Sequence, residues 1–181
     1  MPLEDATDAD LVREFKAGNA AAFDAIVLRF QDRIYRLASI WLYDRQNAGD
    51  AAQEVFLRAY KGLRRFRFRA APFSWLYRCT RNVCNEFNRQ RRGDALDDEP
   101  ADDGNRPHQA HEDDSAARQV RELVQVLPGR QREVVVLRIF EELSVAETAA
   151  AMGCREGTVK ALLHKATQRL KISASNLGLE P

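Results

Sequence analysis

The sequence predicts an all-α protein of two small helical domains: a four-helix N-terminal domain and a C-terminal domain with a helix-turn-helix. Apolar residues recur three and four positions apart along most of the chain, which is the spacing of a buried helix face. The RFRFR run at 65–69 alternates like a strand, but it is too short and too charged to indicate one. An acidic segment that is poor in apolar residues, 93–114, separates the two domains.

The composition narrows the class of protein. Of 181 residues, 45% are hydrophobic and 30% are charged, which suits packed cores in a soluble chain. No apolar run approaches the roughly 20 residues that span a bilayer, and the acidic start MPLEDATDADLVREF lacks the apolar core of a signal peptide. The three cysteines form no CxxC pair, and an odd number argues against a disulfide framework. We therefore expect a cytoplasmic protein without direct membrane insertion.

The N-terminal domain begins with two predicted helices. Thr7 and Asp10 have the spacing of a capping pair, and the helix that follows them ends at Gly18. Asn19 then caps a long helix with one apolar side. The residues of that side are Phe23, Ile26, Val27, Phe30, Ile34, Leu37, Ala38 and Trp41.

Two further helices complete this domain. Asn47 caps the third helix, AGDAAQEVFLRAYKGL, and Pro72 suits the first turn of the fourth, which runs to about Arg92. The expected buried side of the third helix comprises Ala52, Val55, Phe56, Ala59 and Leu63.

The fourth helix has two contrasting sides, because successive residues advance by about 100° around its axis. The apolar side holds Leu76, Cys79, Thr80, Val83 and Phe87. The opposite side holds Arg78, Arg81, Asn82, Asn85 and Arg89. A merely solvated face usually mixes acids with bases, whereas this one has donors and no carboxylate. It favours a phosphate backbone as partner, with an acidic protein surface as the alternative.

Aromatic residues lie beside these arginines. Rings and arginine planes on which bases stack are what hold single-stranded nucleic acid, although most aromatic residues in a helical domain belong to its core. We expect Phe73 and Trp75 to pack at the start of the fourth helix and Phe68 to be exposed. The whole set is Phe66, Phe68, Phe73, Trp75 and Tyr77.

Charge is distributed in blocks that the net charge of +1 conceals. Residues 58–92 carry eleven arginines and lysines against one acid, whereas 94–114 carry nine acids against one base. The segment 93–114 holds two prolines and two glycines, and it cannot bury enough apolar surface to offset its ordering entropy. We therefore expect a flexible acidic linker there, between domains at 5–92 and 115–173.

The C-terminal domain opens with two predicted helices, over about 116–126 and about 130–141, with a break at Pro128 and Gly129. The apolar side of the first comprises Val120, Leu123, Val124 and Leu127.

Two short helices around a glycine complete this domain, in ELSVAETAAAMGCREGTVKALLHKATQRLK. Ser144 and Glu147 have capping-box spacing, and Gly153 stands where a tight turn needs positive φ. Such a pair forms a helix-turn-helix, whose second helix enters the DNA major groove; a helical hairpin without DNA contacts is the alternative. The outward positions of the second helix are Arg155, Glu156, Thr158, Lys160, Ala161, His164, Lys165 and Gln168.

Five blocks of the sequence resemble bacterial sigma factors. LPGRQREVVVLR, ELSVAETAAAMG and GTVKALLHKA occur at the spacing of the sigma C-terminal domain. NAGDAAQEVFLRAY resembles the region that docks on the coiled coil of the RNA polymerase β′ subunit. FRFRAAPFSWLYRCTRNVCNEFNRQRR resembles the region that melts and reads the promoter −10 element. The two-domain layout is similar to that of the extracytoplasmic-function (ECF) group.

The resemblance implies a set of residues for each contact. For core polymerase they are Asp50, Gln53, Glu54, Val55 and Phe56. For the −10 element they are Arg67, Phe68, Arg69, Ala70, Ala71, Trp75, Arg78, Arg81, Asn82, Asn85 and Arg89. For the −35 element they are Arg155, Thr158, Lys160, Ala161, His164 and Lys165. The acids of the first set have a simpler alternative role, because an acidic first turn complements the helix dipole.

Two places depart from the family's habits. The loop that captures a flipped base in the family, here 67–71, often carries small or polar residues, whereas this chain has Phe68-Arg69-Ala70. In the recognition helix, Ala161 and Leu162 replace a small polar residue and an arginine. We therefore expect Thr158 and Lys160 to contact phosphates, and base readout to rest on Arg155, Lys160, His164 and Lys165.

The resemblance implies a dissociable promoter-specificity subunit without a cofactor. Its partners would be core RNA polymerase (β′ coiled coil and β flap), promoter DNA and an anti-sigma factor that holds it inactive. A stand-alone helix-turn-helix repressor or activator is the alternative, which leaves the −10-like helix unexplained. A metal-dependent hydrolase built on Asp50, Glu54 and histidines is disfavoured, because His108 and His111 lie in the expected linker and His164 on a distant helix.

Overall fold

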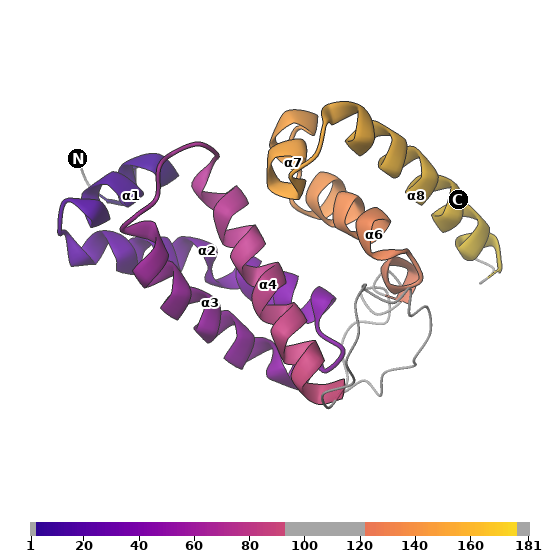
Figure 1. Ribbon diagram of the computed structural model, residues 1–181, viewed down its shortest axis with the longest axis horizontal. Helices are drawn as coiled ribbons and strands as arrows, with labels where there is room; N and C mark the ends of the chain where they lie inside the picture. The colour runs from indigo at the N-terminus through magenta and orange to yellow at the C-terminus, as the bar shows by residue number, and fades with distance from the viewer. Residues whose placement is uncertain (1–2, 93–121, 177–181) are drawn as a thin grey trace. The chain divides into compact units, whose positions relative to one another are not determined.

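The computed structural model describes residues 3–92 and 122–176. They belong to two compact units. Within these ranges every regular element is a helix, which confirms the predicted all-α class (Figure 1). The RFRFR run is loop and turn rather than strand. The predicted linker and its two histidines lie outside the described residues, as does the start of the helix expected over 116–126.

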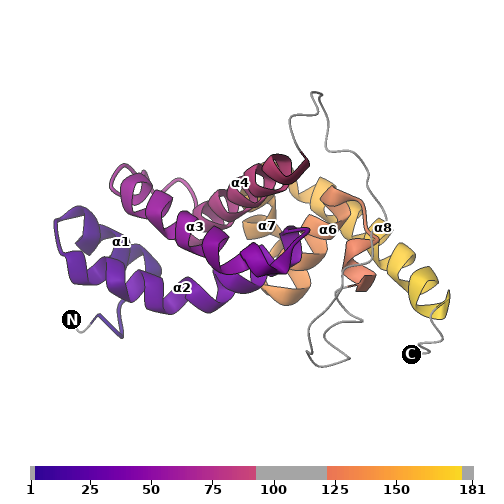
Figure 2. The same cartoon turned by 90° about the horizontal axis from the view of Figure 1, so that it is seen from below.

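The first unit is a bundle of α-helices with one short 3-10 turn. Its elements are α1 (Asp8–Lys16), α2 (Ala20–Trp41), η1 (Arg45–Asn47), α3 (Ala48–Leu63) and α4 (Pro72–Arg92). Helices α2, α3 and α4 all pack on one another, and α1 lies across one end of α2 (Figures 1 and 2). The buried centre is formed by Phe30, Ile34, Leu37, Leu63, Leu76 and Tyr77.

Helix boundaries follow the predicted caps in part. The Thr7 side chain accepts a hydrogen bond from the Asp10 N–H at 3.2 Å, and Gly18 has a φ of +103° after α1. Asn19 and Asn47 stand at N-cap positions, but neither side chain makes a capping hydrogen bond. For Asn47 the reason is its backbone, whose ψ of 2° lies in the preceding 3-10 turn, while a capping side chain needs an extended residue.

The buried side of α3 differs from the prediction. Val55, Ala59 and Leu63 are buried as expected, but Ala52 and Phe56 are only half-buried. Ala48 and Ala51 take their place in the core. The cause is that α3 contacts both α2 and α4, so its core stripe is centred between the two neighbours.

Helix α4 has a buried apolar side and an exposed polar side, as predicted. Leu76, Thr80 and Val83 are buried, and Cys79 and Phe87 are half-buried at the edge of that side. Four of the five residues on the polar side are exposed: Arg78, Asn82, Asn85 and Arg89. Arg81, the fifth, is half-buried.

Gly62 lets α3 approach the start of α4 closely. A Cβ at this position would lie 2.6 Å from two atoms of the Trp75 indole ring. We expect Gly62→Ala to lower the free energy of unfolding by about 1–3 kcal/mol, because the ring must leave its packed position. Tryptophan fluorescence during urea unfolding measures this in the first unit, since both tryptophans, Trp41 and Trp75, belong to it.

Gly49→Ala is the matched control in the same helix, because nothing lies within 4 Å of a Cβ at Gly49. It should leave the stability unchanged or raise it by up to about 1 kcal/mol. Equal effects of the two substitutions would contradict the proposed close approach at Gly62.

The second unit holds the predicted helix-turn-helix. Its elements are α6 (Gly129–Val135), the π-helical η2 (Val136–Phe140), α7 (Val145–Met152) and α8 (Glu156–Asn176). Before α6, residues 122–125 are helical. The helix expected over 130–141 is present, but its second half widens into the π-helical turn, which leaves Ile139 and Phe140 exposed.

Both signals that predicted the two ends of α7 are confirmed. The Ser144 hydroxyl accepts from the Glu147 N–H at 3.2 Å, and the Glu147 carboxylate accepts from the Ser144 N–H at 2.8 Å. Gly153 has a φ of +63°, the left-handed conformation of a helix C-terminus. Arg130 of α6 donates to the Met152 carbonyl at 3.2 Å and to the buried Glu133 carboxylate at 3.0 Å, which ties α7 to α6.

Candidate nucleic-acid and protein interfaces

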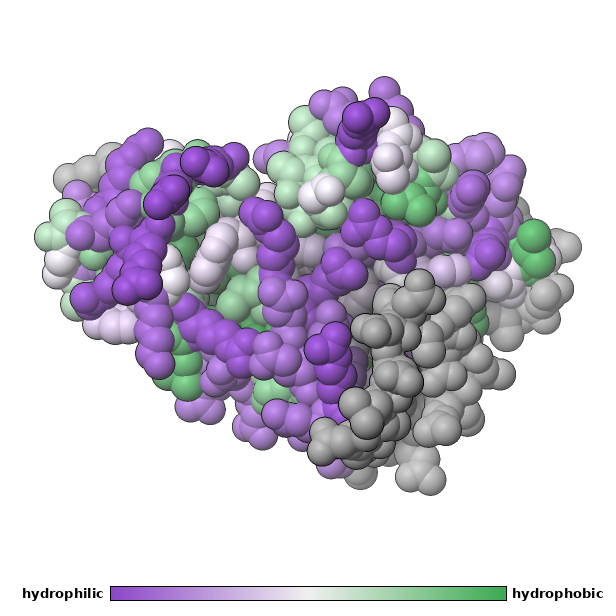
Figure 3. Space-filling view, viewed as in Figure 1, coloured by the Kyte–Doolittle hydropathy of each residue, from purple (hydrophilic) through white to green (hydrophobic). Residues whose placement is uncertain are grey.

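The exposed polar side of α4 presents donors along the helix. Figure 3 shows hydrophilic side chains gathered over α4 and over the loop that precedes it. Arg78 is exposed and its Nε donates to the Ser74 carbonyl at 3.4 Å, which orients the guanidinium along the helix. Glu86, the one acid in 58–92, lies at the edge of this side.

Arg58 of α3 binds that acid. Its two terminal nitrogens each donate to a carboxylate oxygen of Glu86 at 2.7 Å, and its Nε donates to Glu54 at 2.7 Å. The hydrogen bonds from Arg58 hold the pKa of the Glu86 carboxyl below its usual range. The bridge joins α3 to α4, and it neutralises the acid that would otherwise repel a phosphate backbone.

The Arg58–Glu86 pair predicts a pH-dependent stability. The lowered pKa of Glu86 means that the pair stabilises the fold above the ordinary glutamate pKa of about 4.3. This stabilisation is lost as the pH falls through the lower folded-state value. Glu86→Gln should cost about 1 kcal/mol at pH 7, a modest value because both side chains are more than a third exposed, at 38% and 46%. The difference from the unsubstituted protein should disappear towards pH 3.

Tryptophan-detected urea unfolding from pH 3 to pH 7 checks this expectation. Glu54→Gln is the control, since it leaves the bidentate pair intact and removes only the negative charge that faces the Arg58 Nε within α3. A cost of Glu86→Gln that stays constant across this pH range would contradict the assignment.

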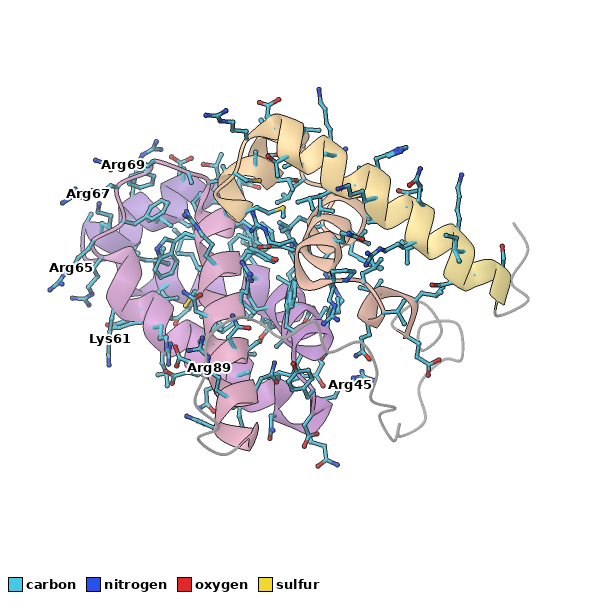
Figure 4. The ribbon with its side chains drawn as sticks, turned by 45° about the vertical axis from the view of Figure 1, so that its right-hand side comes forward. Arg45, Lys61, Arg65, Arg67, Arg69 and Arg89 are labelled. Carbon is cyan, nitrogen blue, oxygen red and sulfur yellow. The ribbon has the colours of Figure 1, made fainter. Side chains whose placement is uncertain are left out.

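The loop before α4 extends its basic surface. Arg67, Phe68, Arg69 and Ala71 are exposed, and Ala70 is half-buried. In Figure 4, Arg65, Arg67 and Arg69 gather at one end of the first unit with their side chains pointing into solvent. Phe68 is 36% exposed, as the sequence predicts.

The other aromatic residues near this loop pack inward. Phe73 is buried, with its ring 5.9 Å from that of Phe30 and the Arg33 guanidinium 3.6 Å above it. Trp75 is half-buried, and its ring lies 6.4 Å from the buried Phe66 ring. These packing positions agree with the sequence prediction, and they leave Phe68 as the exposed ring of the loop.

The residues predicted to bind polymerase do not share one environment. Asp50 and Gln53 are exposed, and Glu54 and Phe56 are half-buried. Val55 is fully buried. Its predicted contact with a partner is therefore corrected to a core role, because it occupies the position of α3 that faces the neighbouring helices.

An apolar groove that the sequence did not predict runs between α2 and α3. It has a volume of about 550 Å³, and its lining includes Val27, Tyr35, Ala52, Phe56, Leu57 and Tyr60. Leu57 is 56% exposed and Tyr35 47% exposed. The available signal was that Leu57 and Tyr35 lie off the buried stripes of their helices. Exposed apolar residues in one groove are typical of a protein-binding surface.

A second, more polar groove of about 330 Å³ lies between α3 and α4. Its α3 side is formed by Asp50, Gln53, Glu54, Leu57 and Arg58, and its α4 side by Glu86, Phe87 and Gln90. The two grooves share Gln53 and Leu57, so the predicted polymerase-binding acids lie beside the apolar groove.

All six predicted −35 residues are exposed: Arg155 directly precedes α8, and Thr158, Lys160, Ala161, His164 and Lys165 lie on it. Val159 and Ala166 are buried on its opposite side. The His164 Nε2 lies 3.0 Å from the Gln168 side-chain nitrogen, on the exposed side. The exposed residues thus form the outer surface of a helix held by α6 and α7, as in DNA-binding helix-turn-helix units.

The described residues offer neither a metal-binding cluster nor a membrane-spanning helix. Over residues 3–92 and 122–176, no three histidine, cysteine or acidic side chains are grouped so that they could hold a metal ion. In the same ranges no helix combines the length and the apolar character needed to cross a bilayer.

Comparisons with known proteins agree with this arrangement. Residues 26–93 match the family model described as Sigma-70 region 2, and 117–170 match Sigma-70, region 4. The chain is 33% identical to the RNA polymerase sigma-H factor of Pseudomonas aeruginosa, over 90% of this chain and 91% of that protein. It is 34% identical to the ECF RNA polymerase sigma factor SigM of Mycobacterium tuberculosis, over 91% and 83%.

Two solved structures share the fold. CnrH, in complex with the cytosolic domain of CnrY, has a TM-score of 0.73 and 22% identity over 93% of this chain and 97% of that one. The sigma factor RpoE of Bartonella quintana, in complex with the anti-sigma factor NepR, has a TM-score of 0.67 and 21% identity over 88% and 98%.

Proposed function

Since the chain belongs to the ECF group of RNA polymerase sigma factors, we propose that it binds core RNA polymerase and opens promoters through its first unit. The observation that carries this proposal is the exposed donor side of α4, which continues into the basic loop 67–71. Glu86, the one acid in the sequence range 58–92, is bound by Arg58. Such a surface suits the backbone of a single strand, and Phe68 offers a ring on which a base can stack.

The second unit would read the −35 element. Its recognition helix α8 exposes Lys160, His164 and Lys165 on one side, which suits donors to base edges in the major groove. Thr158 stands in the first turn of α8, where a phosphate contact is favoured. The domains are then 5–92 for polymerase binding and −10 opening and 115–173 for −35 recognition, joined by 93–114.

Polymerase docking would use α3 and the apolar groove beside it. Asp50, Gln53 and Glu54 provide polar contacts to the β′ coiled coil, and Phe56 and Leu57 provide an apolar one. The β flap would engage the second unit. In this role the chain acts in the cytoplasm with the polymerase and performs no bond chemistry of its own.

Regulation by an anti-sigma factor is part of the proposal. The RpoE structure, which shares this fold, was solved with the anti-sigma factor NepR. A partner that covers both units would prevent polymerase and DNA from binding, and its release would free the sigma factor.

Transcription in vitro tests the proposed function. Core RNA polymerase and a genomic DNA library are incubated with and without the full chain, and transcript 5′ ends are sequenced. New start sites that share −35 and −10 sequences are expected only when the chain is present. A stand-alone repressor or activator would bind DNA and give no promoter-specific initiation by core polymerase, so the absence of new start sites would overturn the proposal.

A further inference from the structure

Helix α1 holds the loop that precedes α4. The Lys16 ammonium donates to the Phe66 carbonyl at 2.6 Å, fifty residues away in sequence. The same ammonium lies 5.3 Å from the centroid of the Phe68 ring, and the Arg13 guanidinium lies 5.3 Å from that centroid as well. Two cations of α1 therefore contact the exposed ring of the loop, at distances where the face of an aromatic ring attracts them.

The backbone of Phe68 needs such support. Its φ is +52°, a left-handed conformation that a bulky residue rarely adopts. Such a conformation persists where the surroundings over-determine it. Here they do, because the Phe66 ring is buried and meets the Phe68 ring edge to face at 5.0 Å.

This arrangement leaves the Phe68 ring available at the surface. The ring is 36% exposed, and the neighbouring Arg67 and Arg69 side chains extend into solvent (Figure 4). An unpaired base could stack on this ring while Arg67 and Arg69, the residues before and after Phe68, bind the neighbouring phosphates.

We propose that Lys16 and Arg13 of α1 are positioning residues for −10 recognition, which hold Phe68 where it stacks on an unpaired promoter base. The inference rests on the proposed function and extends it to a helix that precedes residue 26, where the match to Sigma-70 region 2 begins. Lys16 has the larger role because it fixes both the backbone and the ring. Arg13 also pairs with Asp10 at 2.6 Å and is 63% exposed.

The test uses holoenzyme made from core polymerase and the full chain. Its probe is a promoter found by the genomic transcription experiment, with the −10 positions randomised. Sequencing of the transcribed templates gives the base preference at each position. We expect Lys16→Met to weaken the preference about tenfold at one or two positions, and Lys16→Arg, which retains the charge and the donor, to restore most of it.

Lys61→Met is the matched control. Lys61 is exposed at the same end of the unit, so the substitution removes the same charge near the DNA (Figure 4). It should lower total transcription two- to threefold, in a salt-dependent manner, and leave the base preferences unchanged. Phe68→Leu should reproduce the loss of preference seen with Lys16→Met, and combining the two substitutions should add little.

The outcomes separate the two proposals. If the unsubstituted chain gives no promoter, the proposed function fails. If it does, and Lys16→Met has the same base preferences as Lys61→Met, the positioning role is wrong while the sigma function stands. Should Lys16→Met prevent holoenzyme formation, Arg13→Gln decides, because Arg13 is mostly exposed and its loss removes one cation from the ring. Unchanged preferences for Arg13→Gln would then overturn the proposal.

Discussion

Leu57→Glu is expected to weaken binding to core RNA polymerase on the order of 100-fold, because it places a carboxylate in the apolar groove between α2 and α3. Leu57 is 56% exposed, so the substitution should leave the fold intact. The loss is large because a docked partner would bury the new charge without a counter-ion. Titration of fluorescently labelled full chain with core polymerase measures the dissociation constant.

Leu28→Glu is the matched control. Leu28 is a leucine of α2 with 70% exposure, and it is not among the residues that line the groove. The same change there should alter polymerase affinity by less than about threefold. If both substitutions weaken binding equally, the effect comes from charge alone. If neither does, the groove is not the docking surface.

Local signals predicted the helix ends well where one side chain or one glycine decides them. Thr7 begins α1, and Gly18 follows it with positive φ. The Ser144–Glu147 box and Gly153 frame α7 in the same way. Each signal depends on groups within four residues, so sequence spacing contains all the information that the structure uses.

The surfaces were harder to predict because they depend on which neighbours each helix meets. Periodicity placed both Val55 and Phe56 in the core, and the family resemblance placed both on the docking surface, whereas in the structure Val55 is fully buried and Phe56 lines the groove. Both lie on one helix, and a shift of about one residue in the buried stripe exchanges their roles. Only the packing of α3 against α2 and α4 fixes that shift.

Contacts between distant segments carried no sequence signal. The Lys16–Phe66 hydrogen bond and the Arg58–Glu86 pair join residues fifty and twenty-eight positions apart. The exposed donors of α4 and α8 were predictable nonetheless, since a helix with one buried stripe has its polar residues on the remaining sides. The sequence thus specified which residues are presented, and the tertiary packing specified how they are held.

The second large effect is expected at the recognition helix. Lys165→Ala should weaken holoenzyme binding to a promoter with the native −35 element by about 10- to 100-fold, the value of one lost base contact. Lys165 is exposed on α8, whereas the next residue, Ala166, is buried. Binding to the same fragment with a scrambled −35 element should change little, so the ratio of the two affinities should fall.

Lys171→Ala removes the same charge about 9 Å further along α8, past the predicted contacts. It should weaken holoenzyme binding to both fragments by no more than about threefold. The only other expected change is a smaller dependence of the affinity on salt concentration. If Lys165→Ala lowers the affinity for the native and the scrambled fragment equally, Lys165 contacts a phosphate and not a base. No loss on either fragment would place −35 recognition elsewhere on α8. Because Ala161 and Leu162 offer no hydrogen bonds from their side chains, specificity would then depend on Arg155, Lys160 and His164.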